Sequence, residues 1–212
     1  MLTDKRRTSN QTRCERTRDR LLDAAATVFV RQGYHASTVS DIVAEAGVGQ
    51  GSFYRHYVSK RDIFDALFDS VMGQIVVEVE SIAESLPTNI QEYREVSVRV
   101  VTGAARILRA NQPLVQLFLS EGPSVDLEFG RKLEEVYQVI ASLARGYLDH
   151  AMSLGFARQC NTYVVSQMLI GAGVRLITEY FSGRLDDIGV EDAVREGVDF
   201  AFEGFGPALH RP

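Results

Sequence analysis

The stretch from Ser37 to Lys60 constrains the fold most, because it holds two helix-length segments separated by a glycine turn. In the first segment Ile42 and Val43 begin an apolar face at helical spacing, and Thr38 is a suitable N-cap for it. Gly47 is expected to end that helix, since glycine readily adopts the left-handed conformation of a helix C-terminus. A second short helix is expected over residues 50–57. Two helices joined by such a turn are the outline of a helix-turn-helix.

The rest of the chain repeats its apolar residues at helical spacing and shows no strand pattern. The sequence therefore predicts an all-α fold with about nine helices: an N-terminal three-helix helix-turn-helix domain, then a larger helical domain. We predict a disordered basic arm over 1–14, the DNA-binding domain over 15–60 and the second domain over 61–208, linked by a helix that starts near residue 60. The expected helices are 15–32, 38–46, 50–57, 60–86, 89–110, 113–120, 124–154, 162–181 and 192–205.

Charge is divided unevenly along the chain. The whole sequence has a net charge of -5, but residues 1–60 hold 10 Lys and Arg against 6 Asp and Glu. The remaining residues hold 13 against 22, so a basic third (net +4) precedes an acidic remainder (net -9). This asymmetry is expected when only one end of a protein meets phosphate; for Lys5 to Arg20 alone, a solvated charge run is an open alternative.

Several other classes of protein are disfavoured. No apolar run reaches the roughly 18 residues of a membrane span, and no apolar stretch follows the basic N-terminus as in a secretory signal. Two cysteines, Cys14 and Cys160, cannot make a disulfide framework, so we expect a cytoplasmic protein. The four histidines have no metal-ligand spacing, and no nucleophile elbow or complete phosphate loop is present. We therefore predict neither enzyme activity nor a cofactor nor a metal.

The first third of the chain also resembles a known family. Residues 15–68 are similar to the N-terminal domain of the TetR family of transcriptional regulators. The resemblance implies a DNA-binding regulator, followed by a C-terminal domain that usually binds a ligand and dimerises. The motifs that carry it are Leu21-Leu22-Asp23-Ala24-Ala25, Phe29, Gly33-Tyr34, Thr38-Val39, Ile42, Ala46-Gly47-Val48, Gly51-Ser52-Phe53-Tyr54-Arg55-His56-Tyr57 and Ser59-Lys60.

The second short helix carries the candidate base-reading residues. Gln50 and Ser52 lie on its first turn, which meets base edges in this motif. Gln pairs with adenine through two hydrogen bonds, and Ser bonds several bases. Gly51 has no side chain, so the backbone can approach the groove closely. Arg55 lies one turn on, within reach of a guanine or a phosphate.

A second group of residues is expected to hold phosphates, which set the register of a protein on DNA. Thr38 and Lys60 stand at helix N-termini, where backbone amides favour anions. Tyr54, His56 and Tyr57 can donate to phosphate oxygens, and the TetR resemblance favours Tyr54 and His56. A core position is an open alternative for Tyr57, and a partly buried structural role is one for His56.

The acidic part supplies candidates for an effector cavity, although an ordinary bundle core explains each of them equally well. Arg175 is the most informative, because a buried cation requires a partner, either Glu179 at i+4 or an anionic ligand. The hypothesis is a largely apolar small-molecule effector with an acidic group. The cavity candidates are Phe68, Met72, Leu108, Phe118, Phe129, Tyr137, Met168 and Arg175.

The last two helices are the expected homodimer surface, with Gly171, Gly173, Ala201 and Phe202 buried in a four-helix bundle. Two recognition helices would then address the half-sites of a palindromic operator on double-stranded DNA. We predict a repressor that its ligand releases from the operator; activation is an open alternative. A helical enzyme or protein-interaction bundle that retains a helix-turn-helix is the rival from another class.

Overall fold

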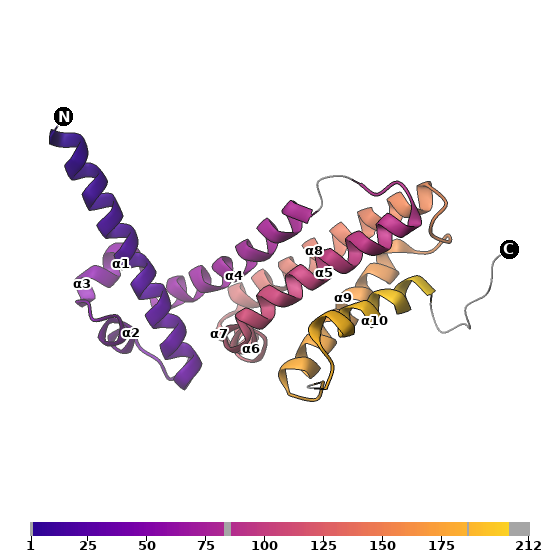
Figure 1. Ribbon diagram of the computed structural model, residues 1–212. Helices are drawn as coiled ribbons and strands as arrows, with labels where there is room; N and C mark the ends of the chain where they lie inside the picture. The colour runs from indigo at the N-terminus through magenta and orange to yellow at the C-terminus, as the bar shows by residue number, and fades with distance from the viewer. Residues whose placement is uncertain (1, 83–85, 186, 204–212) are drawn as a thin grey trace. The chain divides into compact units, whose positions relative to one another are not determined.

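The computed structural model describes residues 2–82, 86–185 and 187–203, with side chains from Cys14 onward. These ranges contain ten helices and no strand, which confirms the all-α prediction (Figure 1). The helices are α1 Leu2–Gln32, α2 Val39–Ala46, α3 Gln50–His56, α4 Lys60–Ile82, α5 Ile90–Ala110, α6 Gln112–Ser120, α7 Gly122–Val125, α8 Leu127–Ser153, α9 Thr162–Phe181 and α10 Val190–Glu203.

The helices differ most from the predicted ones at two places. α1 begins at Leu2, where the sequence predicts a disordered arm over 1–14, and no glycine or proline interrupts residues 2–32. Gly122 and Pro123, expected to break the chain, open the four-residue α7, since proline suits the first turn of a helix. α8 consequently begins at Leu127 instead of Ser124, and the count is ten instead of about nine. The expected end of the last helix, at 204–205, lies outside the described residues.

Contacts divide the chain into two compact units, and each unit combines two separate stretches. The first unit is Met1–Met72 with Pro113–Gly130, and the second is Gly73–Gln112 with Arg131–Pro212. This division differs from a single boundary near residue 60, because α6, α7 and the first turn of α8 join the unit that contains α1–α3. The functional assignment of 15–60 and 61–208 stays a prediction.

An aromatic cluster forms the core of the first unit. The Phe64 ring lies 5.3 Å from that of Phe118 and 5.0 Å from that of Phe129, measured between centroids. Phe29 of α1 packs edge-on against Phe64 at 5.5 Å. All four side chains are buried, so α6 and α8 contribute to the same core as α1 and α4. Aromatic pairs in such geometries stabilise a core by about 0.5–1.5 kcal/mol beyond their burial.

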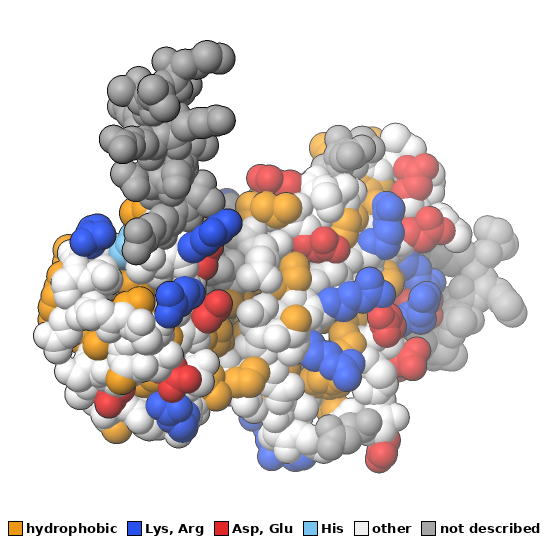
Figure 2. Space-filling view, turned by 60° about the vertical axis from the view of Figure 1, so that its left-hand side comes forward, with side chains coloured by type: hydrophobic (Ala, Val, Ile, Leu, Met, Phe, Trp, Pro, Cys, Tyr) orange, Lys and Arg blue, Asp and Glu red, His pale blue; other side chains and the backbone are white. Residues whose placement is uncertain are grey.

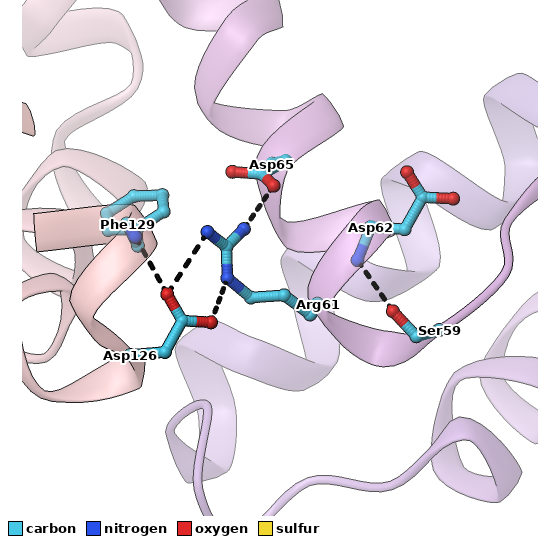
Figure 3. Close-up of polar contacts among 6 residues, drawn as sticks. All are labelled: Ser59, Arg61, Asp62, Asp65, Asp126 and Phe129. Atoms are coloured by element: carbon cyan, nitrogen blue, oxygen red, sulfur yellow. Dashed lines mark hydrogen bonds and ion pairs between the residues drawn. The ribbon is translucent and has the colours of Figure 1, made fainter. Parts of the chain in front are cut away.

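Arg61 of α4 connects this core to the start of α8 (Figure 3). Its Nε donates to Asp126 Oδ2 at 2.6 Å, and its guanidinium also pairs with Asp65 one turn along α4. Asp126 Oδ1 accepts the backbone N–H of Phe129 at 2.7 Å, which caps α8. The hydrogen bond from Arg61, followed by that from Phe129, lowers the pKa of Asp126 below its ordinary value. A separate cap begins α4, where the Asp62 N–H donates to Ser59 Oγ at 3.1 Å.

In the second unit, α10 lies against α5 through ion pairs. Arg94 of α5 pairs with Asp199 at 2.7 Å and with Glu203 at 2.9 Å, both on α10. About three turns further along α5, Arg106 pairs with Glu191 at 2.7 Å. Figure 2 shows basic and acidic side chains lying next to one another on one face of the molecule, with hydrophobic side chains exposed between them. Among the described helices, none combines the length and apolar character of a membrane span.

Candidate DNA-binding site

A complete capping box starts α2. Thr38 Oγ1 accepts the Asp41 N–H at 3.2 Å, and Asp41 Oδ2 accepts the Thr38 N–H at 2.8 Å. The same carboxylate oxygen accepts the Thr38 hydroxyl at 2.7 Å, and hydrogen bonds from the Thr38 side chain and backbone lower the pKa of Asp41. The Thr38–Asp41 spacing in the sequence correctly indicated this cap. Phosphate contact by Thr38 stays a prediction, with its hydroxyl proton engaged by Asp41.

The turn between α2 and α3 depends on Gly47, which adopts φ 62° and donates to the Ala44 and Val43 carbonyls. Val48 follows, and its N–H donates to the Val43 carbonyl at 3.0 Å. α3 is then anchored by Phe53, which is 0% exposed. Arg20 of α1 donates to the Ala46 carbonyl at the end of α2, which ties the first helix to the turn. These contacts fix the orientation of α3.

The predicted base-reading residues lie on the outer surface of α3. Gln50, Gly51 and Arg55 are exposed and Ser52 is half-buried. Gln50 Nε2 donates to Ser40 Oγ at 3.1 Å, so the amide is held in place while Gln50 remains exposed. A Cβ at Gly51 would meet nothing within 4 Å, so no other residue covers the backbone at this position. Base contact by these residues stays a prediction.

Two predicted phosphate contacts lie on the same surface. Tyr54 is exposed, and its ring packs edge-on against Phe53 at 5.4 Å. His56 is half-buried, with both ring nitrogens 4.0 Å from the Cys14 sulfur of α1. Phosphate contact by Tyr54 and His56 stays a prediction.

Tyr57 and Lys60 do not fit the phosphate role predicted for them. Tyr57 is 3% exposed, packs on Phe53 and has its hydroxyl buried, so the core alternative is the correct one. Lys60 Nζ donates to the carbonyls of Tyr34 at 2.6 Å and Ser37 at 2.7 Å, and lies 4.2 Å from the centre of the Tyr34 ring. Burial lowers the pKa of Lys60. Its ammonium therefore holds the connection between α1 and α2 together.

Three polar positions of this unit were missed from the sequence. Ser40 orients Gln50, Arg20 binds the end of α2, and Glu121 Oε2 accepts the Tyr34 N–H at 2.9 Å. Ser40 stands two residues after the Thr38 N-cap, and this place in the first turn of α2 was the only signal in the sequence. Arg20 and Glu121 act on partners 26 and 87 residues away, which no local spacing reveals.

Comparison with known proteins agrees with this geometry. The family model described as bacterial regulatory proteins, tetR family, matches residues 21–67, which span the end of α1, α2, α3 and the start of α4. Residues 21–67 thus match the TetR family model. The match supports a DNA-binding transcriptional regulator with a helix-turn-helix.

Relatives are similar over most of their length. The fatty acid metabolism regulator protein of Bacillus subtilis is 26% identical over 79% of this chain and 78% of its own. The regulator UidR of Escherichia coli K12 is 25% identical over 88% of both chains. The crystal structure of FadR from Bacillus subtilis in complex with stearoyl-CoA is 25% identical, with a TM-score of 0.73 over 88% of this chain and 98% of that one. FadR from Bacillus halodurans shares the fold, with a TM-score of 0.74.

The predicted effector-cavity residues divide between the two units. Phe68, Phe118 and Phe129 are buried together, with centroids 5.2–6.3 Å apart, and they fill the core of the first unit with Phe64. Half-buried Met72 also belongs to that unit. The remaining candidates belong to the second unit: Leu108, Tyr137, Met168 and Arg175.

Arg175 is not the buried cation that the sequence suggested. Its side chain is exposed and pairs with Glu179, which is the i+4 partner named from the sequence. The hydrogen bond from Arg184, followed by the charge of Arg175, lowers the pKa of Glu179. Arg175 thus has its counter-ion in the chain, and the acidic group of an effector loses its main support.

The predicted dimer residues lie open in the single chain. Added Cβ atoms at Gly171 and Gly173 would meet nothing within 4 Å, and Ala201 and Phe202 are exposed. These positions are available to a second copy, and the dimer surface stays a prediction. Among the described residues, no group of three or more His, Cys, Asp or Glu side chains could hold a metal.

Proposed function

We propose that this regulator is a repressor that binds a palindromic operator as a homodimer and is released by a fatty acyl-CoA. One observation carries the DNA part: α3 is anchored by buried Phe53 and exposes Gln50, Gly51 and Arg55 on the outer side of a capped, glycine-turned helix pair. Residues of these kinds read base edges in the major groove.

The effector class is supported by the relatives and by the composition of the second unit. A relative with 26% identity is a fatty acid metabolism regulator, and a structure with 25% identity contains stearoyl-CoA. The sequence independently favours a largely apolar effector. Exposed apolar side chains on α8 and α9, among them Leu143 and Met168, supply the surface that such a molecule or a second copy would cover.

The proposed mechanism is a population shift. The operator favours dimers whose two α3 helices stand about one DNA turn, or a multiple of it, apart. An effector that binds better to a dimer with another spacing lowers operator affinity by its difference in affinity for the two states. The exposed glycines of α9 would allow the close helix contact that a four-helix dimer interface requires.

Selection of bound fragments from the source genome, followed by titration of the selected operator, tests the proposal. We expect one palindrome, affinity that falls steeply with salt, and release by stearoyl-CoA. Arg55→Ala should weaken operator binding by about 1–3 kcal/mol, whereas Arg131→Ala, an exposed arginine of α8, should not. A chain that binds no DNA at low salt would support the rival helical enzyme or interaction bundle.

A further inference from the structure

Two buried phenol hydroxyls between α5 and α8 have no hydrogen-bond partner among the described residues. Tyr93 of α5 is 1% exposed, and the Tyr147 hydroxyl of α8 is also enclosed. Their rings lie 4.6 Å apart, so the two side chains form one polar-tipped pair. A buried hydroxyl without a partner costs about 1–3 kcal/mol, and native structures rarely keep one unless a water or ligand completes it.

The nearest neighbours of the Tyr93 ring are aromatic, and the Ser97 hydroxyl lies beside Tyr147. The ring centroids of His150 and Phe156 lie 5.9 Å and 6.0 Å from that of Tyr93. Ser97 donates its own hydroxyl proton to the Tyr93 carbonyl at 2.7 Å. Burial raises the pKa of Tyr147 to about 12, so this phenol keeps its proton throughout the neutral range. Both tyrosine hydroxyls can therefore donate a hydrogen bond to an acceptor that the described residues do not supply.

An apolar stripe of α8 leads to this pair. Val139, Ile140 and Leu143 precede Tyr147 by eight, seven and four residues, which places all four on one helix face. The three apolar residues are 60%, 42% and 65% exposed, although the helix buries Ala141. The stripe from Val139 to Tyr147 is about 12 Å long, at 1.5 Å per residue. An exposed apolar stripe that ends at two buried hydroxyl donors matches an amphiphile with a hydrocarbon chain and an acceptor oxygen.

We propose that Tyr93 and Tyr147 donate hydrogen bonds to the carbonyl or carboxylate oxygen of a fatty acyl effector, whose chain lies along Val139, Ile140 and Leu143. This inference rests on the proposed function and deepens it, because it names the polar group that the second unit recognises. A second copy of the chain would cover the stripe but would leave the hydroxyls unpaired. A water would pair the hydroxyls but would leave the stripe exposed.

The test uses Tyr93→Phe and Tyr147→Phe in the full chain, each of which removes one hydroxyl. Calorimetric titration of the protein alone with stearoyl-CoA, and separately with stearate, measures binding without DNA. We expect each substitution to weaken binding about tenfold, the equivalent of one hydrogen bond. The midpoint of urea unfolding without ligand should stay or rise for Tyr93→Phe, because its hydroxyl has no partner among the described residues. A preference for one probe identifies thioester or free acid as the source of the oxygen.

Matched controls isolate the site. Tyr163→Phe removes a hydroxyl from an exposed tyrosine of α9 and should leave both affinities unchanged. Leu143→Asn, at an exposed position of the stripe, should weaken both probes without unfolding the chain. Equal binding by the wild type and by both buried Tyr→Phe variants would overturn the inference, as would a wild type that binds neither probe.

Failure of the inference and failure of the proposed function give different results. If stearoyl-CoA releases the operator equally from the wild type and both buried Tyr→Phe variants, the proposed function stands and the site is wrong. If binding depends on the two hydroxyls but the operator is never released, the site stands and the proposed regulation by acyl-CoA is wrong.

Discussion

Lys60→Met distinguishes a structural lysine from a DNA contact. Lys60 is the first residue of α4, where a phosphate contact was expected, yet its ammonium donates to the Tyr34 and Ser37 carbonyls. Methionine keeps most of the apolar stem and removes only the charge and the donors. We therefore expect the variant to lose stability rather than to lose a DNA contact.

The expected loss follows from what each carbonyl keeps. Tyr34 O also accepts the Ser37 hydroxyl at 2.7 Å and the Ser37 N–H at 3.3 Å, so it remains paired in the variant. The Ser37 carbonyl loses a charged donor, which is worth about 1.5–3 kcal/mol. The stacking of Nζ over the Tyr34 ring adds about 0.5–1 kcal/mol, and the burial that lowers the pKa of Lys60 offsets part of the total. The free energy of unfolding should fall by about 2–3 kcal/mol.

Urea unfolding and the salt dependence of operator binding, measured on the same preparation, decide between the two roles. Arg55→Met is the matched control, because Arg55 is an exposed cation of α3. We expect Arg55→Met to keep its stability and lose operator affinity, and Lys60→Met to do the reverse at temperatures where it is folded. An unchanged unfolding midpoint for Lys60→Met, with a salt slope smaller by about 0.9, would refute the structural role.

Three further substitutions test the first unit. Phe129→Ala should lower the free energy of unfolding by about 3–5 kcal/mol in urea, since the ring is fully buried, and a loss below 1 kcal/mol would contradict the shared core. Asp126→Asn should be less stable than the wild type at pH 7. Because Arg61 lowers the pKa of Asp126, that advantage is lost as the pH falls from 3.8 through the lowered value, and thermal unfolding against pH should show the two converge. Gly33→Ala forces φ 81° on alanine and puts its Cβ 2.8 Å from Glu121 Oε1, so the free energy of unfolding should fall by at least about 1–2 kcal/mol. Adding Glu121→Ala to this variant should relieve the steric clash but not the backbone strain.

Local signals in the sequence predicted local structure well. The Thr38–Asp41 capping box, the left-handed Gly47 and the span of α9 all follow from neighbours within a few residues. The carbonyl contacts of Lys60 could not be predicted, because its acceptors lie 23 and 26 residues away, and charge at a helix start resembles a phosphate site. Arg175 was taken as buried because α9 is apolar on most sides, whereas the single chain leaves much of that helix exposed.

The contribution of Pro113–Gly130 to the first unit limits how this chain can be recombined. A chimaera joined near residue 72 would separate Phe64 from Phe118 and Phe129, and Arg61 from Asp126. The transplanted N-terminal part would then expose the Phe64 ring and would leave Arg61 without Asp126. Exchange of DNA specificity between relatives should therefore succeed by grafting the surface residues of α3. It should also succeed if both stretches of the first unit, Met1–Met72 and Pro113–Gly130, are transferred together. The unit that carries α3 is therefore encoded by two separate stretches of the gene.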